Sequence, residues 1–141
     1  MDGIRIGTAA GRPLRTRAAA AGAALLTVAA GLAVRSVVGG EFAARSGTAL
    51  YTVLVYTLVV VAAPRARPVM VAGVALGVSW AVEFLQLSGV PAELSARSWP
   101  ARMVLGSTFD PADLPWYAVG AALGWLAHVA VRAIGAPARD R

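Results

Sequence analysis

The stretch 69-VMVAGVALGVSWAVEFLQL-87 decides the fold of this protein. It is apolar except for Ser79, Glu83 and Gln86. A helix rises about 1.5 Å per residue, so about 18 residues or more are needed to cross a hydrocarbon core about 30 Å thick. The stretch is therefore predicted to span a membrane as one helix that carries three polar side chains.

Three other apolar runs carry the same signal. Pro64 and Pro68 bracket one short connection, because proline cannot continue a helix and biases the preceding residue away from helical backbone. The first run is longer than the apolar part of a secretory signal, so it is predicted to remain as a span. We expect a single all-α integral membrane domain over 1–141, a bundle of about four helices, with spans at 18–38, 48–63, 69–87 and 114–134, a long connection at 88–113, and tails at 1–17 and 135–141.

Composition excludes several classes of protein. The chain has 141 residues, 58% of them hydrophobic, and all 13 of its basic residues are Arg. The Arg residues form short clusters between apolar runs, which is typical of membrane flanks, so no nucleic-acid partner is expected. The absence of Cys excludes disulfides and thiolate metal sites, and a single His excludes a histidine-rich one. We predict no metal and no cofactor.

Arginine placement predicts the orientation, because cytoplasmic flanks of membrane helices carry an excess of Lys and Arg. The ends of the spans on the side of the two termini carry Arg5, Arg12, Arg15, Arg17, Arg65, Arg67, Arg132, Arg139 and Arg141. The opposite ends carry Arg35, Arg45, Arg97 and Arg102, mixed with Glu41, Glu93, Asp110 and Asp113. We therefore expect a multi-pass protein of the inner (plasma) membrane with both termini in the cytoplasm. The connection 88–113 would face outward, with 92–104 as one short helix on the membrane surface, although Pro100 disfavours it.

Polar residues gather toward the outward side. Ser79, Glu83 and Gln86 share one face of their helix. An ionisable group inside a membrane costs about 2.5–3.5 kcal/mol on insertion scales, so Glu83 calls for a partner or a use. Its candidate partners are Arg35, at a similar depth on the first span, and Arg97 or Arg102 in the outward connection.

The fourth span has its own start signals and packing residues. Asp113 is predicted to cap it, and Trp116 with Tyr117 to anchor it at the interface. Gly73 and Gly77, like Gly120 and Gly124, form GxxxG patterns that allow close helix packing in lipid, within the bundle or in a homo-oligomer. His128 shares a face with Gly120 and Gly124, and we expect it to make a hydrogen bond between helices or to lie at the interface, and not to bind a ligand.

Several of these residues carry a family resemblance. Glu83-Phe-Leu-Gln86-Leu, Arg97, Leu105 to Phe109, Asp113-Leu114, Tyr117 and Gly120 resemble the family called domain of unknown function 2809, small bacterial membrane proteins. The resemblance covers the chain from about Arg35 to Gly124 and is more distant to VanZ-like proteins of the cell envelope. It implies a polar signature of Glu83, Gln86, Arg97 and Asp113, with Arg35 as a supporting charge. The chain departs from the family pattern at Asp110-Pro-Ala, so the start of the fourth helix is expected to differ locally.

These residues favour a binding or accessory role in the cell envelope. An outer-leaflet polar pocket would hold a membrane lipid or an envelope head group, such as a lipid or glycan precursor. None of the usual catalytic motifs is present, so an enzyme is not favoured. The alternatives are a subunit of an oligomeric transporter or channel, an enzyme that modifies envelope lipids through Glu83 and Asp113, or polar groups that only join the helices to one another.

Overall fold

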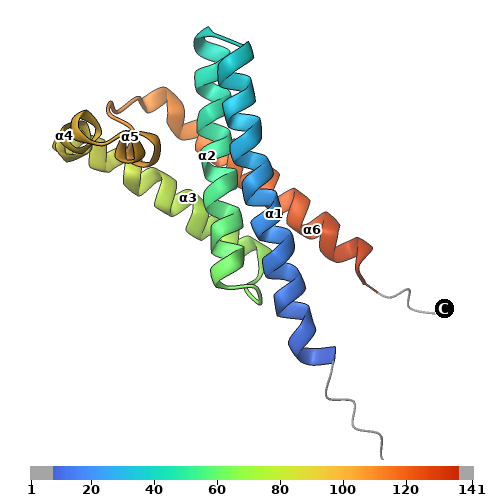
Figure 1. Ribbon diagram of the computed structural model, residues 1–141. Helices are drawn as coiled ribbons and strands as arrows, with labels where there is room; N and C mark the ends of the chain where they lie inside the picture. The colour runs from blue at the N-terminus through green and yellow to red at the C-terminus, as the bar shows by residue number, and fades with distance from the viewer. Residues whose placement is uncertain (1–7, 137–141) are drawn as a thin grey trace, which may run out of the picture.

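The computed structural model describes residues 8–136 and is all-helical over that range (Figure 1). The tails 1–7 and 137–141, with Arg5, Arg139 and Arg141, lie outside the described residues. Two short 3-10 turns, η1 (Gln86–Ser88) and η2 (Pro111–Asp113), adjoin the α-helices. The α-helices are α1 (Thr8–Val37), α2 (Gly40–Ala62), α3 (Pro68–Leu85), α4 (Val90–Arg97), α5 (Trp99–Leu105) and α6 (Leu114–Ile134).

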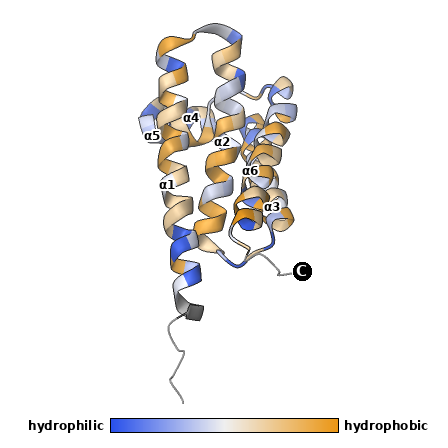
Figure 2. Ribbon diagram, turned by 90° about the vertical axis from the view of Figure 1, so that its right-hand side faces the viewer, coloured by the Kyte–Doolittle hydropathy of each residue, from blue (hydrophilic) through white to orange (hydrophobic). Residues whose placement is uncertain are grey.

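Four segments are long and apolar enough to cross a membrane: Gly11–Val37, Gly40–Ala62, Pro68–Ser88 and Pro111–Ile134. At most 28% of the residues in any of them are buried within the protein. The surfaces of these segments that face away from the bundle are rich in Leu, Val and Trp, while hydrophilic residues gather at the N-terminal end of α1 (Figure 2). Apolar surface on this scale requires lipid as its solvent, which confirms a membrane protein.

The long connection between the third and fourth spans differs from the expectation of one short helix at 92–104. It contains two helices, α4 and α5, so the described residues hold six α-helices where about four were expected. Ser98 has extended backbone and separates them, and its hydroxyl accepts a hydrogen bond from the N–H of Ala101. Pro100 lies in the first turn of α5, where its missing N–H costs nothing, so it begins a helix instead of interrupting one.

The second span begins earlier than its apolar run suggested. α2 starts at Gly40, and its first turns carry Glu41 and Arg45, which form an ion pair four residues apart at 3.4 Å. An i to i+4 pair of opposite charge is compatible with a helix end that reaches the interface. Hydropathy alone therefore underestimates the length of this helix.

Helix α2 lies at the centre of the bundle and packs against α1, α3 and α6, while α4 packs on α5 (Figure 1). A core cluster joins the lower halves of the first three helices through Ala20, Tyr56, Val60, Val71 and Ala75. The hydroxyl of Tyr56 also lies 2.9 Å from Nδ1 of His128 on α6, which confirms the expected hydrogen bond between helices.

The two glycine pairs differ in what they contact. A Cβ atom on Gly120 would overlap the carbonyl oxygen of Ala49, and one on Gly124 would lie 2.8 Å from Cγ of Tyr56, so α6 approaches α2 closely at both positions. Gly73 and Gly77 are exposed, and a Cβ atom there would meet nothing within 4 Å. Only the second GxxxG pattern therefore packs helices within the described bundle.

We predict that Gly124→Ala lowers the thermal stability of the protein in detergent, because overpacking against Tyr56 costs about 1–3 kcal/mol. Gly77→Ala is the matched control, since it adds the same methyl group to a helix surface with space around it. Scanning fluorimetry should give a lower melting temperature for the first variant and an unchanged or higher one for the second. Equal behaviour of the two variants would contradict the close approach of α2 and α6.

Candidate functional site

Glu83 is the largest fully buried side chain, with 1% of its surface exposed. Its Oε1 accepts a hydrogen bond of 2.7 Å from the backbone N–H of Asp110, and its Oε2 accepts one of 2.5 Å from the hydroxyl of Tyr117. Both oxygens are therefore occupied, as a buried carboxylate requires. The contacts join the C-terminal half of α3 to the start of α6.

Tyr117 was expected to anchor the helix at the interface beside Trp116, and this expectation is wrong. Tyr117 is 7% exposed and points inward, whereas Trp116 is 39% exposed. Trp80 contributes a further contact between the same two helices, because its indole N–H donates to the carbonyl oxygen of Leu114 at 3.2 Å. The Glu83 contact thus lies in an interface where hydrogen bonds join α3 and α6.

Arg45 on α2 is the residue that the sequence reasoning did not assign to the site. Its Nη1 donates to Oδ1 of Asp113 at 2.5 Å and to Oδ2 of Asp110 at 3.0 Å, while Nη2 reaches Glu41. The sequence did contain a signal for this contact, because Arg45 and Asp113 lie at neighbouring ends of their spans and carry opposite charges. Matching opposite charges at the same depth of the bundle would have predicted the pair.

The start of α6 is built by Asp110 and not by Asp113. Oδ1 of Asp110 accepts a hydrogen bond of 3.0 Å from the N–H of Ala112 and so caps η2. That N–H, followed by the Arg45 guanidinium, lowers the pKa of Asp110 below its usual value. Asp113 makes no capping hydrogen bond, because its carboxylate is held by Arg45. The expected cap at Asp113 is therefore wrong, and Asp110-Pro-Ala is where the helix start is formed.

None of the three arginines proposed as partners contacts Glu83. Arg35 is exposed on α1, and Arg97 is exposed at the end of α4. Arg102 on α5 donates from Nε and Nη2 to the carbonyl oxygen of Ser95, at 3.3 and 3.2 Å. Within residues 8–136, no carboxylate lies within salt-bridge distance of any of these three arginines.

Gln86 fastens the end of α5 to the end of α3. Its Nε2 donates to the carbonyl oxygen of Leu105 at 2.8 Å, and the hydroxyl of Ser95 donates to the carbonyl oxygen of Gly106 at 2.6 Å. Gly106 has φ +64°, and a Cβ atom there would lie 2.6 Å from Nε2 of Gln86, so only glycine fits. Oε1 of Gln86 is buried and has no hydrogen-bond partner among the described residues.

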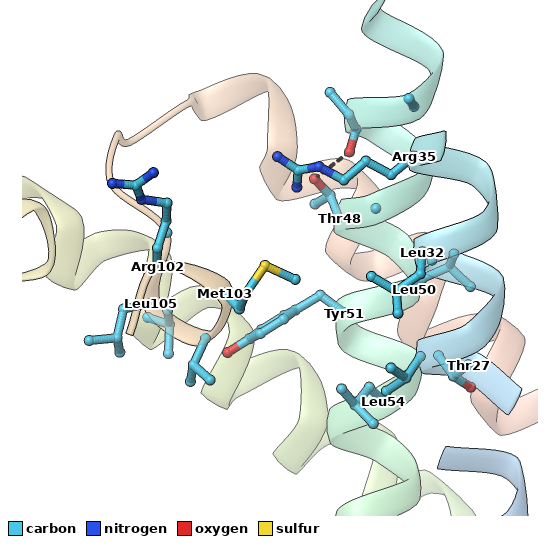
Figure 3. A pocket seen from close by; sticks show the side chains of 18 of the residues that line it. Thr27, Leu32, Arg35, Thr48, Leu50, Tyr51, Leu54, Arg102, Met103 and Leu105 are labelled. Atoms are coloured by element: carbon cyan, nitrogen blue, oxygen red, sulfur yellow. Dashed lines mark hydrogen bonds between the residues drawn. The ribbon is translucent and has the colours of Figure 1, made fainter. Parts of the chain in front are cut away.

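A groove of about 850 Å³ lies between α1 and α2 on one side and the end of α3 with α5 on the other (Figure 3). Arg35 from α1 and Arg102 from α5 are the charged residues among the described ones that line it. In Figure 3 both arginines lie at one end of the groove, and Leu32, Leu50 and Leu54 lie toward the other. Small residues of α2 leave the space open, namely Gly40, Ala43, Ala44 and Gly47.

The residues singled out from the sequence therefore belong to two neighbouring sites, which share Tyr117. Glu83 and Asp113 belong to a polar network, defined here as Arg45, Glu83, Asp110, Asp113 and Tyr117. Arg35 and Gln86 line the groove, and Arg97 belongs to neither site. No group of three or more His, Asp or Glu side chains arranged to hold a metal ion is present within residues 8–136.

A family model described as "Protein of unknown function (DUF2809)" matches residues 37–121. The chain belongs to this family. The matched range contains the whole polar network and the α2, α3 and α5 walls of the groove, whereas the α1 wall precedes it. Comparisons with curated proteins and with solved structures find no match. The more distant likeness to VanZ-like proteins stays a prediction.

We predict that Arg45→Gln lowers the melting temperature of the protein by several degrees, because it leaves the Asp113 carboxylate without its cationic partner. Glu83→Gln should destabilise by a similar amount, since an amide can accept from only one of the two donors now facing Glu83. Arg97→Gln, which removes an exposed charge, should leave the melting temperature unchanged. A loss as large in Arg97→Gln would show that the network has no special role in stability.

Proposed function

We propose that this protein is a non-enzymatic binding or accessory protein of the cell envelope, whose groove holds a lipid by its head group. The observation that supports this most directly is the composition of the groove walls. Two arginines without carboxylate partners among the described residues lie at one end, and leucine side chains line the other (Figure 3). A lipid has the same division between a polar head and an apolar chain.

The surroundings of the groove favour a lipid over a water-soluble ligand. Its α1 wall belongs to a membrane-spanning helix. On another face of this helix, Leu25 and Leu26 are about three-quarters exposed to the surrounding solvent. In a bilayer, that solvent is lipid. A partly open groove between such helices is therefore in direct contact with acyl chains.

The polar network supports binding better than catalysis. Both oxygens of Glu83 accept hydrogen bonds from the protein, and Asp113 is paired with Arg45. Neither carboxylate lines the groove, so neither faces a ligand held there. A general base must come within hydrogen-bond reach of the proton that it removes. We therefore give the network the role of holding the outward connection in place.

The proposal includes an orientation in which both termini are cytoplasmic, the protein lies in the inner (plasma) membrane, and the groove opens in its outer leaflet. Arginines at the N-terminal end of α1 and in the Arg65–Arg67 turn support it. Because the chain has no Cys, single cysteines can be introduced without a background of native thiols.

We predict that Ser107→Cys, in the connection between α5 and α6, reacts with a membrane-impermeant maleimide in intact cells. Ala63→Cys, in the turn between α2 and α3, should react only after the cells are permeabilised. Both residues are exposed in the structure, so burial does not explain a difference between them. The reverse pattern of labelling would overturn the orientation.

We also predict that a large side chain inside the groove expels the bound lipid. Gly47 lines the groove, and a Cβ atom added there would meet nothing within 4 Å, so Gly47→Phe should fill space without a clash at its base. Native mass spectrometry of protein extracted from lipid nanodiscs should show fewer retained lipids than the wild type. Gly77→Phe, on the exposed face of α3, is the matched control and should retain as many as the wild type. Equal retention by both variants would argue against a lipid site in the groove.

A further inference from the structure

We infer that the groove is selective for lipids with an anionic head group, and that Arg35 and Arg102 form the selective contact by binding the lipid phosphate from opposite walls. The inference rests on the proposed function, because it names the class of lipid that the groove would take. It depends on the charges that line the groove and on where their possible partners lie.

The described lining of the groove carries cationic side chains and no carboxylate. Arg35 and Arg102 are the charged residues in it, and they come from α1 and α5, which face one another across the opening (Figure 3). Both arginines are exposed, so their guanidinium groups are available to a ligand. A guanidinium binds a phosphate or carboxylate through charge-assisted hydrogen bonds of fixed geometry.

Part of the Arg102 guanidinium is already oriented by the protein. Nε and one hydrogen of Nη2 are used by the carbonyl oxygen of Ser95, and Nη1 keeps both of its donors free of any hydrogen bond within the described residues. Ser95 is itself 3% exposed, and its hydroxyl donates to Gly106, so its carbonyl group is fixed in place. The cation is thus held at the groove, while no carboxylate of the described chain compensates its charge.

Asp110 and Asp113 are bound at a face of α2 that does not line the groove. Arg45 and Ala49 belong to the face that α6 covers, whereas Gly47, Leu50 and Leu54 belong to the face that lines the groove. Asp110 and Asp113 are both hydrogen-bonded to Arg45 at that covered face. Both carboxylates are therefore engaged by Arg45, and neither lines the groove.

The apolar end of the groove identifies the anion as part of a lipid. Leu32, Leu50 and Leu54 line the space below the arginines, and they offer no hydrogen bond to a small soluble anion. They match an acyl chain that continues from a head group held at the arginine end. Anionic lipids are attracted to basic clusters at a membrane surface in the same way.

The test compares lipid retention in nanodiscs made of equal amounts of phosphatidylglycerol and phosphatidylcholine with identical acyl chains. The wild type should retain the anionic lipid about tenfold over the zwitterionic one, which corresponds to about 1.4 kcal/mol. Arg35→Gln with Arg102→Gln should abolish this preference while the total number of retained lipids stays the same. Arg97→Gln is the matched control, because it removes an exposed charge from the same side of the protein outside the groove, and it should keep the preference.

Three results would overturn the inference. Loss of the preference in Arg97→Gln would assign it to the overall surface charge, and an unchanged preference in the double variant would show that the two arginines only extend toward the interface. Displacement of the retained phosphatidylglycerol by millimolar glycerol 3-phosphate would indicate a site for a soluble anion.

The proposed function fails separately, namely when Gly47→Phe retains as many lipids of both kinds as the wild type. Melting temperatures of all variants identify any that do not fold, and Ala44→Phe, at another exposed groove position, then replaces Gly47→Phe.

Discussion

The hydrogen bonds that end on the Glu83 carboxylate constrain the half of this molecule that holds the connection between α3 and α6. A carboxylate 1% exposed between membrane-spanning helices is stable only when donors replace the water it has lost. One of its donors is the backbone N–H of Asp110, and the other is the hydroxyl of Tyr117 on α6. A backbone donor fixes the chain itself and not only a side chain, so Glu83 sets where the connection from α5 returns to the bundle.

The groove follows from this constraint. Since Asp110 is tied to α3 by Glu83 and to α2 by Arg45, the connection is held at both helices. Gln86 and Ser95 hold the C-terminal end of α5, where this connection begins, through the carbonyl oxygens of Leu105 and Gly106. α5 is thereby kept opposite α1, and the space between them remains open because α2 presents small residues to it. The network and the groove share Tyr117, and the network determines the shape of the groove.

The sequence predicted the spans because hydropathy and length are properties of each segment by itself. It also predicted that Ser79 and Glu83 share one face of their helix, since helix periodicity fixes which residues lie together, and both are buried in the structure. The partners of Glu83 could not be predicted in this way. They depend on the rotation and tilt of α6 against α3. One of them is a backbone N–H, which nearly every residue carries and which residue type therefore does not predict. Tyr117 resembled an interfacial anchor because it follows Trp116 at the start of an apolar run.

The distribution of charge around Arg45 and the groove indicates that Arg35 and Arg102 do not serve to neutralise the carboxylates of the protein. Glu41, Asp110 and Asp113 all share the single guanidinium of Arg45. If pairing charges were the only requirement, a second arginine turned toward these carboxylates would lower the energy of the cluster, because like charges at close range repel. Arg35 and Arg102 instead line a groove whose described lining has no anion of its own. This arrangement of two cations around a groove without carboxylates is the reason for proposing an anionic lipid as its occupant.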